Sequence, residues 1–589
     1  MNLITPPLSG KSYSWINKTY PKLTCLFSAF LVAFPLTSNA ARTSTTIDPD
    51  GALVLKGDGL VINTNTNDLY TIDGTGEKVK ISDFEEVRVF VTPTSDGGRG
   101  NTPWSFRLDA PETDLYIRID APDVDAAENS DAIHMTNWQP TINVRNFNAY
   151  VNAQKSDALN ISREADRGSA KFQTFTAVVE HGNGMRANTS DLEGEATIFV
   201  EKGTNITINA DSESDKVRNP TAVFAGSDET FGRTKGTANI DLNGTTLLTL
   251  NGAGNYGIWA GKNGSISVED VVITSQGKNS YGIAANGNTL HNGIDIGSFK
   301  IDSQVLLDGQ NYSIEMLGDG SRALAAEDSC GKILSANGGI NTLHAIGNIE
   351  ATSQGLVDIT TNGRTDIVGA FTSQSRGTIN WVAKGGLLIS SKTEGDEFPT
   401  VIYAGDTSRF ATGTDAITLS YGAASNITGD IVAIKNGQIT ISPIEGTTSR
   451  KDTATTMYLK GDVIAANGGK IDLKFGNGSH WVGRTDDYKD ADSADWNETH
   501  SSIFTPSFSA PVTSSGSVSV NLGEGSTWTL TGQSWLSSLQ GSNNVIDLTA
   551  EDGEGNHALH IGTITGSNNT FVMNLLRDGS GNMLYVYQG

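Results

Sequence analysis

The sequence predicts an all-β protein folded as a right-handed parallel β-helix, a solenoid in which successive coils of chain stack on one another. Three observations predict this fold: a short apolar motif that recurs along the chain, an excess of turn-forming residues, and the lack of any helix-period stretch of 12 or more residues after residue 40. Glycine accounts for 66 of the 589 residues, about 11% against an average near 7%. Many short strands that end in tight turns would have this composition.

The recurring motif is a tetrapeptide that reads small, aliphatic, variable, apolar. Because side chains alternate across a strand, its second and fourth residues share one face, which is always apolar, and its third residue faces the other way. Eight copies occur, and the first seven begin 26, 26, 38, 35, 25 and 41 residues apart. Fixed strands joined by connections of variable length are expected of coils of constant size from which loops extend. The copies are Ala132–Met135, Ala158–Ile161, Gly184–Ala187, Ala222–Ala225, Gly257–Ala260, Gly282–Ala285, Ala323–Ala326 and Val401–Ala404.

A second repeat begins at Gly347, Gly429 and Gly461, and each copy reads as a strand, a Gly/Asn turn and another strand. A closed β-sandwich would need hairpins of matched length and two protected edges. A stack of coils, each paired in parallel with its neighbours, fits the irregular spacing better.

The first 40 residues read as an export signal rather than as part of the fold. Three lysines precede an apolar stretch at residues 23–36, and Ser38 and Ala40 are the small residues that a signal peptidase reads. We therefore expect cleavage between Ala40 and Ala41. A transmembrane anchor is the weaker alternative, because the apolar stretch has 14 residues and a spanning helix needs about 20.

Charge and cysteine content bear on the partners and on the compartment. The chain has 41 Lys and Arg against 66 Asp and Glu, a net charge of −25, which argues against a nucleic-acid or anionic-membrane partner. Cys25 falls within the export signal, so Cys330 is the sole cysteine of the exported chain and cannot form an internal disulfide. A large exported protein without disulfides suits passage across a second membrane in an unfolded state. A core cysteine without further meaning is the alternative.

The C-terminal residues 461–589 contain a recognisable order of elements. A Gly-rich strand with Trp528 is followed by S-W-L-S-S-L from Ser534, V-I-D-L from Val545 and a closing D-G-S-G-N-M-L-Y-V-Y from Asp578. This order resembles the C-terminal passenger region of pertactin-like type V autotransporters. Two coils further upstream, N-Y-G-I-W-A-G and S-Y-G-I-A-A-N, are similar to repeats of the same family.

The resemblance implies a pectin-lyase-like β-helix that is exported and threaded through an outer-membrane β-barrel translocator to the cell surface. It divides the chain into a signal peptide (1–40), an N-terminal β-rich region or cap (41–130), passenger repeats (131–460) and C-terminal autochaperone coils (461–589). The autochaperone would fold first, and its nucleus would be the core residues Trp528, Trp535, Phe571 and Leu584. The same residues could instead be ordinary core.

The barrel of that family would follow the passenger, yet nothing follows Gly589 in this sequence. We expect that the chain is a fragment, that the barrel is encoded separately, or that export has been lost. The fragment is the preferred interpretation.

The sequence predicts no catalytic residues, no metal ligands and no cofactor. It has neither the Gly-Asp-Ser-Gly motif of serine-protease passengers nor a Gly-x-Ser-x-Gly elbow with plausible His and Asp partners. An acidic run could hold Ca²⁺, but it lacks the glycine that an EF-hand loop has at its sixth position, and we prefer a solvated loop. The run consists of Asp486, Asp487, Asp490, Asp492 and Asp495.

Three aromatic residues occupy the variable third position of the motif: Phe224, Trp259 and Tyr403. If the apolar positions point into the coil, these rings point outward and offer stacking sites for sugars or for a host protein. Alternatively, loops cover them, since large aromatic side chains are seldom left bare.

These observations favour a non-enzymatic protein of the bacterial surface, which acts in adhesion or self-association through a long β-helix face. The alternative is a polysaccharide lyase or hydrolase on the same scaffold, whose carboxylates come from neighbouring coils and are therefore hidden from sequence motifs. A third interpretation is a structural spacer that presents residues 41–130.

Overall fold

The computed structural model describes residues 44–57, 68–70, 78–91, 107–121, 131–135, 139–162, 165, 167–188, 194–212, 219–227, 236–286, 303–391, 400–405, 413–445, 455–488, 514–549, 557–574 and 581–588. By its internal contacts the chain divides into two units, Met1–Ala41 and Arg42–Gly589. Every described residue belongs to the second unit. The expected signal peptide, with its cleavage position between Ala40 and Ala41, lies outside the described residues.

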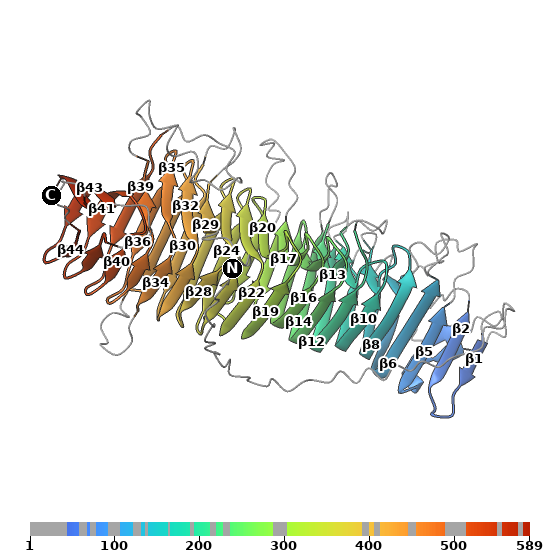
Figure 1. Cartoon of the computed structure of the whole chain (residues 1–589). Helices are drawn as coiled ribbons and strands as arrows, with labels where there is room; N and C mark the ends of the chain where they lie inside the picture. Colours follow the sequence, from blue (N-terminus) through green and yellow to red (C-terminus); the bar gives the residue numbers. More distant parts are fainter. Residues whose placement is uncertain are drawn as a thin grey trace, which may run out of the picture. The chain divides into compact units, whose positions relative to one another are not determined.

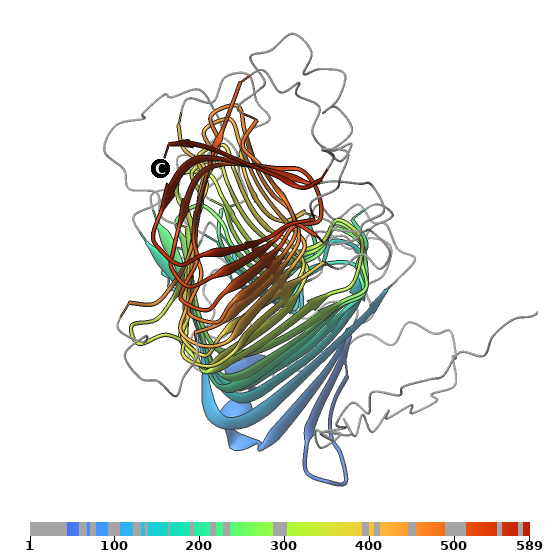
Figure 2. The ribbon, with the colours of Figure 1, turned by 60° about the vertical axis from the view of Figure 1, so that its left-hand side comes forward.

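The described chain is almost entirely β-strand, and most of its strands form two large sheets. One sheet has 30 strands and the other has 13, and neighbouring strands are parallel except at β1 (Ser44–Ile47). In Figure 1 the strands follow one another in chain order, and in Figure 2 successive coils lie over one another. The prediction of an all-β parallel β-helix is confirmed.

A complete coil has three straight segments, which we call the first, second and third faces. The 13-stranded sheet forms the third face, with one strand from each coil. Its strands are β7 (Ile133–Met135), β9 (Leu159–Ile161), β11 (Met185–Asn188), β13 (Thr221–Gly226), β15 (Tyr256–Ala260), β17 (Tyr281–Asn286), β20 (Arg322–Glu327), β23 (Asn348–Thr352), β26 (Phe371–Gln374), β29 (Thr400–Ala404), β32 (Asp430–Ile434), β35 (Val463–Ala466) and β38 (Thr485–Asp486).

The 30-stranded sheet forms the first and second faces. In six coils one long strand covers both: β6 (Arg107–Ala121), β8 (Thr141–Ala153), β10 (Ser169–Val179), β12 (Glu195–Ile208), β14 (Thr237–Leu250) and β16 (Gly264–Ser275). The first face continues in β18 (Ser303–Leu307), β21 (Gly331–Ser335), β24 (Leu356–Thr361), β27 (Thr378–Ala383), β30 (Ala416–Tyr421), β33 (Gln438–Pro443), β36 (Lys470–Lys474) and β39 (Ser517–Asn521). In the last coils β41 (Ser534–Gln540) and β43 (Ala558–Thr565) each cover two faces, since the first half of β41 lies beside β38 of the third face and its second half pairs with β39. The last strand, β45 (Met583–Gln588), pairs with β43. The second face consists of β1, β2 (Leu53–Gly57), β5 (Glu86–Val91), β19 (Asn311–Met316), β22 (Thr342–Ile346), β25 (Thr365–Val368), β28 (Leu387–Ser390), β31 (Ser425–Thr428), β34 (Met457–Lys460), β37 (His480–Val482), β40 (Thr527–Thr529), β42 (Val545–Asp547) and β44 (Thr570–Val572), together with the second halves of the long strands.

The apolar motif forms the third face, and the second residues of its copies lie in a single column. Every member is at most 4% exposed and belongs to one continuous core. The repeat that begins at Gly347, Gly429 and Gly461 continues the same column. Strand pairing links, coil by coil, Ile133, Leu159, Met185, Val223, Ile258, Ile283, Leu324, Ile349, Phe371, Ile402, Ile431 and Val463.

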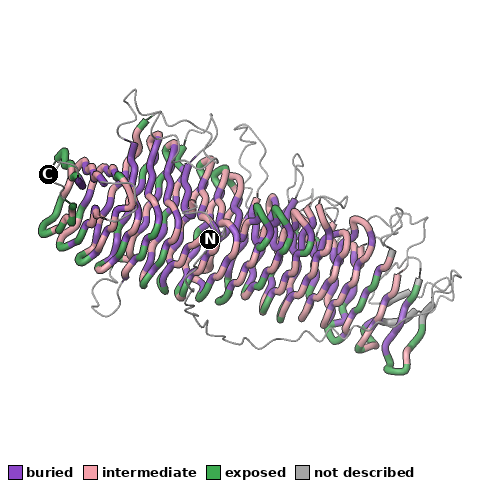
Figure 3. Tube along the Cα trace, in the orientation of Figure 1, coloured by how far each residue is buried: buried purple, intermediate pink, exposed green. Residues whose placement is uncertain are grey.

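One hydrophobic core runs through the stack from Leu53 to Ile561. Inward and outward residues alternate along each strand, and β8 is buried at every second position over most of its length. Figure 3 shows this alternation as purple and pink segments along the tube. Parallel pairing joins β5 to β6 and β6 to β8, so the sheet continues without a break from the N-terminal region into the repeats.

The two ends of the described stack differ. At the N-terminal end β1 pairs antiparallel with β2, and a separate antiparallel pair is formed by β3 (Asp68–Tyr70) and β4 (Lys78–Lys80), which precede a 3-10 turn at Ile81–Asp83. At the C-terminal end, within the described residues, β45 pairs with β43 alone. Val586 of β45 is 42% exposed, whereas its register partner Ile561 is buried.

The four residues predicted as the core of a folding nucleus divide into two groups. Trp528 is fully buried and stacks on Trp481 at 4.3 Å between ring centroids, and Phe571 and Leu584 pack against the core while partly exposed. Trp535 was wrongly placed in the core. Its strand neighbours Ser534 and Leu536 are the buried ones, and its ring lies on the outer side, stacked on His560 at 5.1 Å.

Candidate functional site

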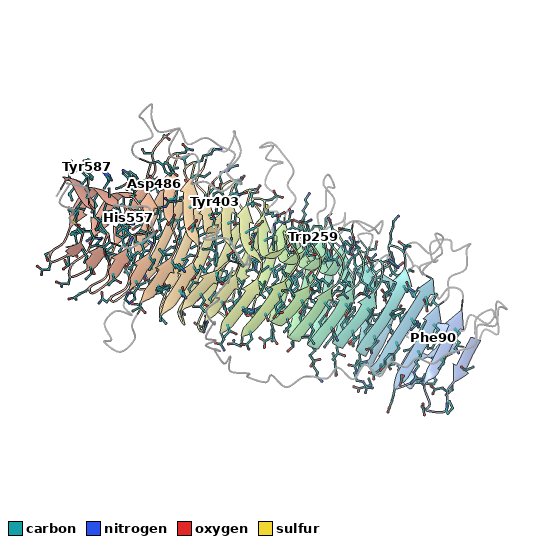
Figure 4. All side chains as sticks on the ribbon, viewed as in Figure 1. Phe90, Trp259, Tyr403, Asp486, His557 and Tyr587 are labelled. Carbon is teal, nitrogen blue, oxygen red and sulfur yellow. The ribbon has the colours of Figure 1, made fainter. Side chains whose placement is uncertain are left out.

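The three aromatic residues predicted as outward-facing stacking sites lie on the outer side of the third face. Register places Phe224 next to Trp259, with Tyr403 several coils further along the same sheet (Figure 4). Their exposed fractions are 1% for Phe224 and 7% for Trp259 and Tyr403. The expectation of an open stacking surface is therefore wrong, because a ligand cannot stack on a ring that is closed off from solvent. Their burial agrees with the alternative, in which they are covered.

Trp259 belongs to a continuous series of rings and guanidinium groups in contact on the third face, in which Phe224 and Trp259 meet edge to face. Successive members are separated by 5.0, 4.9, 4.8, 4.4 and 4.9 Å, measured between ring centroids or from a guanidinium carbon to a centroid. The last member also forms an ion pair with Glu350. Contacts on both sides of each ring indicate a stabilising role. The series is Arg186, Phe224, Trp259, Tyr256, Tyr281 and Arg322.

Two buried carboxylates lie near the N-terminal end of the third face, where the sequence predicted no site. Asp131 Oδ2 is 2.6 Å from His134 Nδ1, and Asp157 Oδ2 is 3.8 Å from Arg186 Nη1. Burial raises the pKa of Asp157, and the charge of Asp131 raises it further, while Arg186 opposes the shift. The carboxylates are at most 4% exposed, whereas the side chains of His134 and Arg186 keep 30% and 22%.

These carboxylates also belong to a ladder of hydrogen bonds along the corner that leads into the third face. Asp131 Oδ1 accepts the backbone N–H of Asp157 at 2.7 Å, and Asp157 Oδ1 accepts that of Asn183 at 3.0 Å. Backbone N–H groups at a corner have no partner within a sheet, and burying them unpaired is costly. A small polar side chain at this position therefore joins one coil to the next. In other coils the same role falls to Asn183, Ser280, Ser321, Asn348, Asp430 and Asp462.

The acidic run considered as a calcium loop is only partly described. Asp486 Oδ1 accepts the backbone N–H of Tyr488 at 2.8 Å, and Asp487 Oδ2 accepts the hydroxyl of Ser537 at 2.8 Å; both carboxylates are buried. Asp490, Asp492 and Asp495 lie outside the described residues. Across the part of the chain that the structure describes, no group of three or more His, Cys, Asp or Glu could hold a metal ion.

The second face carries the exposed side chains best suited to contact with another molecule. Its outer side consists of two rows, each an unbroken series of register partners, which we call the two-row surface. The first row is Arg88, Tyr116, Asn148, Thr176, Asn205, Leu247, Val272, Ser313, His344, Asp366, Leu388, Asn426, Tyr458, His480, Thr527, Val545 and Thr570. The second row is Lys56, Phe90, Arg118, Tyr150, Val178, Thr207, Thr249, Thr274, Glu315, Ile346, Val368, Ser390, Thr428, Lys460, Val482, Thr529, Asp547 and Val572.

Large apolar side chains are exposed at intervals along the two-row surface. Tyr116, Val272, Tyr458 and Val545 of the first row and Val572 of the second are between 37% and 40% exposed. On five successive strands of the second face, β8, β10, β12, β14 and β16, the two rows contain no charged residue. These uncharged positions are Asn148, Tyr150, Thr176, Val178, Asn205, Thr207, Leu247, Thr249, Val272 and Thr274.

Exposed aromatic residues therefore lie on the second face and not on the third face, where the sequence predicted them. A signal for the two-row surface exists in the later coils, where a first-row residue stands five positions before a residue of the buried column, as Tyr458 does before Val463 and Asp366 before Phe371. In the earlier coils, connections of variable length remove this spacing. Asn205 precedes Val223 by 18 positions.

No protein-family model matches the chain, and no match to a curated protein was found. The resemblance of residues 461–589 to autotransporter passengers therefore rests only on the order of sequence elements described above. Over the described ranges, no helix has the length and apolar character that crossing a bilayer would require.

Proposed function

We propose that this chain is an exported, non-enzymatic protein of the bacterial surface that acts in adhesion or self-association through its two-row surface. The observation that carries the proposal is the unbroken register of the two rows, with exposed Tyr and Val side chains among Thr, Asn and Ser. A repeated surface of this kind offers many weak contacts, which together give strong attachment when they form at once.

The charge distribution also supports this proposal. The chain has a net charge of −25, so two copies, or a copy and an anionic cell, repel each other over most approaches. The uncharged stretch of the two-row surface on β8 to β16 is a region where another surface approaches with less repulsion.

Lysine substitutions on the two-row surface test this role. In the triple variant Val272→Lys, Tyr458→Lys and Val545→Lys we expect weaker binding of cells to immobilised protein and less self-association by sedimentation, since each exposed apolar contact is replaced by a solvated charge. These side chains are already exposed, so the fold should remain intact.

The matched control places three lysines on the first face of the same stack, at the exposed positions Thr237, Thr418 and Gln438. If both variants lost cell binding and self-association equally, the effect would be due to the added charge in general rather than to the two-row surface. An unmodified chain that neither binds cells nor associates with itself would contradict the proposal.

We also propose that the chain reaches the surface as an autotransporter passenger, through an outer-membrane β-barrel translocator. The parallel stack supports this, because a coil templated by its neighbour suits a chain that emerges in one direction. The test is protease digestion of intact cells that express the complete gene. Protection of residues 44–588 from protease until the cells are lysed would contradict it.

A glycan-cleaving enzyme is the second candidate, and the cluster of Asp131, His134, Asp157 and Arg186 favours it. Polysaccharide-cleaving sites combine carboxylates with a basic residue on neighbouring coils, as here. The near-complete burial of both carboxylates and their bonds to backbone N–H groups favour a structural role instead. New reducing ends released from a polysaccharide panel, and lost in Asp131→Asn, would support the enzyme; no release would exclude it.

A further inference from the structure

Three aromatic residues gather on neighbouring strands at the N-terminal end of the two-row surface. Phe90 of β5 and Tyr150 of β8 stand two strands apart in the second row, and Tyr116 of the intervening β6 is in the first row. Tyr116 is 38% exposed, and Phe90 and Tyr150 are partly exposed. Figure 4 shows Phe90 at this end of the stack. We call these three residues and the cations beside them the aromatic patch.

Cationic side chains alternate with the rings of the aromatic patch. Along the second row the order is Lys56, Phe90, Arg118 and Tyr150, and Arg88 precedes Tyr116 in the first row. Lys56 Nζ is 5.7 Å from the centroid of Phe90, and the guanidinium carbon of Arg118 is 4.4 Å from that of Tyr150. These contacts hold the rings and the polar groups in fixed relative positions.

Carboxylates balance the charge of these cations. Arg88 pairs with Asp48 at 2.7 Å and with Glu86 at 2.5 Å, and Arg118 pairs with Asp120 at 2.9 Å. Three acids therefore stand beside Arg88 and Arg118. Near the other two rings, Asp114 pairs with Arg145 beside Tyr116, and Glu180 lies beside Tyr150. The aromatic patch thus combines apolar rings with planar hydrogen-bonding groups and carries no excess of positive charge.

We propose that the aromatic patch binds an extended, neutral polysaccharide, with the chain lying across β5, β6 and β8. This inference rests on the proposed role in adhesion and names its partner. The apolar face of a sugar ring packs on aromatic carbons, and its hydroxyls exchange hydrogen bonds with guanidinium and carboxylate groups that are already oriented.

The spacing of the rings agrees with such a ligand. Neighbouring strands lie about 4.8 Å apart, so Phe90 and Tyr150 are separated by about 10 Å along the stack. The disaccharide repeat of an extended 1,4-linked β-glycan has a similar length, so alternate sugars of one chain would meet successive rings. Burial raises the pKa of both Tyr116 and Tyr150, and the hydroxyl of Tyr150 also forms a hydrogen bond with Glu180.

The charges and the apolar area of the aromatic patch favour a neutral polysaccharide over an acidic polymer or a protein partner. A nucleic acid or an acidic glycan would need unpaired cations, whereas Arg88 and Arg118 are each paired with carboxylates. A protein partner would be expected to bury a larger, more apolar centre than three rings separated by charged groups.

Isothermal titration calorimetry tests the inference with cellohexaose, chitohexaose and mannohexaose as neutral probes and with a galacturonate hexamer as the acidic probe. We expect at least one neutral probe to bind, and to bind more tightly than the galacturonate hexamer. In Tyr116→Ala/Tyr150→Ala we expect its affinity to fall about tenfold or more, and Tyr116→Leu, which keeps an apolar side chain without the ring, should lose affinity as well.

The control is Tyr585→Ala, because Tyr585 is about as exposed as Tyr116 but lies outside the two-row surface, on β45 at the C-terminal end of the described stack. Its affinity for the probe should remain within about twofold of the unmodified chain. Failure of all three neutral probes to bind, tighter binding of galacturonate, or an equal loss in Tyr585→Ala would overturn the inference. If the unmodified chain still adheres to cells or to itself while binding no probe, only the glycan partner is wrong; if it does neither, the proposed function fails as well.

Discussion

Two tryptophans of the C-terminal coils show that the side of the strand on which a residue lies decides how much it contributes to the stability of the fold. Trp528 points inward, stacks on Trp481 with an interplanar angle of 3°, and donates its indole N–H to the carbonyl of Gly483 at 3.0 Å. Trp535 points outward and stacks on His560. Both were expected to be core, because the sequence does not reveal which of two adjacent positions faces inward where the strand meets a corner.

The two tryptophans are therefore expected to respond differently to truncation. Trp528→Ala should lower the free energy of unfolding by about 3–5 kcal/mol, because it opens a large cavity and leaves a carbonyl without its donor. Trp535→Ala should cost about 1 kcal/mol, in line with a partly buried stacking contact on the outer side of the strand. Urea unfolding followed by circular dichroism measures both, and equal losses would show that Trp535 is part of the core after all.

Asp430 gives the stability of the protein a dependence on pH. Burial raises its pKa from the ordinary 3.8 to about 7. The native protein therefore holds a proton that the unfolded chain releases above about pH 4, and the free energy of unfolding falls as pH rises from about 4 to about 7. This contribution of Asp430 to the free energy of unfolding is complete below the pKa that Asp430 has in the unfolded chain, and it is lost above the pKa that it has in the folded protein.

Asp430→Asn should remove this part of the dependence while keeping an acceptor for the backbone N–H of Asp462, which lies 2.8 Å from Asp430 Oδ1. Between pH 5 and pH 8 we expect the unmodified chain to lose on the order of 2 kcal/mol more stability than the variant does. Thermal or urea unfolding at the two pH values gives the comparison. The exposed Asp358→Asn serves as the control, and a pH dependence as steep in Asp430→Asn as in the unmodified chain would contradict the assignment.

At the level of the element, a stack of glycines shapes the corner between the second and third faces. A Cβ on Gly461 would lie 2.1 Å from the carbonyl oxygen of Gly429, and one on Gly483 would lie 2.0 Å from that of Gly461. Consecutive coils thus approach too closely at this corner for any side chain. This close approach accounts for the glycine at position 461. What all three starting glycines of the second repeat share is a positive φ, which is 122° at Gly347, 132° at Gly429 and 154° at Gly461.

Gly461→Ala should therefore destabilise the coil by more than backbone strain alone. Gly338 is a matched control, since it also has a positive φ, 105°, but a Cβ there meets no atom within 4 Å. We expect Gly338→Ala to cost about 1 kcal/mol and Gly461→Ala at least twice as much. Hydrogen exchange of β34 and β35 should rise in Gly461→Ala, and equal effects of the two substitutions would show that the close approach is relieved at little cost.

The elements that the sequence predicted best are those with a strict local pattern. The third-face strands were identified correctly because a small residue, an aliphatic residue and a turn recur together at fixed positions. β26 was missed, because F-T-S-Q has a polar residue, Ser373, at a position that is apolar elsewhere; its hydroxyl is buried and donates to the carbonyl of Gly377 at 2.7 Å. The two-row surface was missed for another reason: it exists only through register between coils, and connections of unequal length hide that register from the sequence.

At the scale of the whole stack, stability is expected to be a sum of contributions from neighbouring coils. Nearly all pairings join a coil to the one before and the one after it, from β5 to β45. In such a solenoid, damage to one coil weakens its neighbours and leaves distant coils folded, provided that each part keeps enough coils for a core. A globular domain of the same size would instead lose its structure as a unit.

Ile283→Asp separates these two behaviours. Ile283 lies in the buried column, paired with Ile258 before it and Leu324 after it, so the substitution places a carboxylate in the core without a partner. Hydrogen exchange measured by mass spectrometry should show lost protection in β15, β17 and β20 and preserved protection in β31 to β42. Val272→Asp, on the two-row surface of the same coil and 40% exposed, should leave protection almost unchanged. A uniform loss over all coils in Ile283→Asp would mean that the stack unfolds as one cooperative body, and the expectation that stability is a sum over neighbouring coils would have to be abandoned.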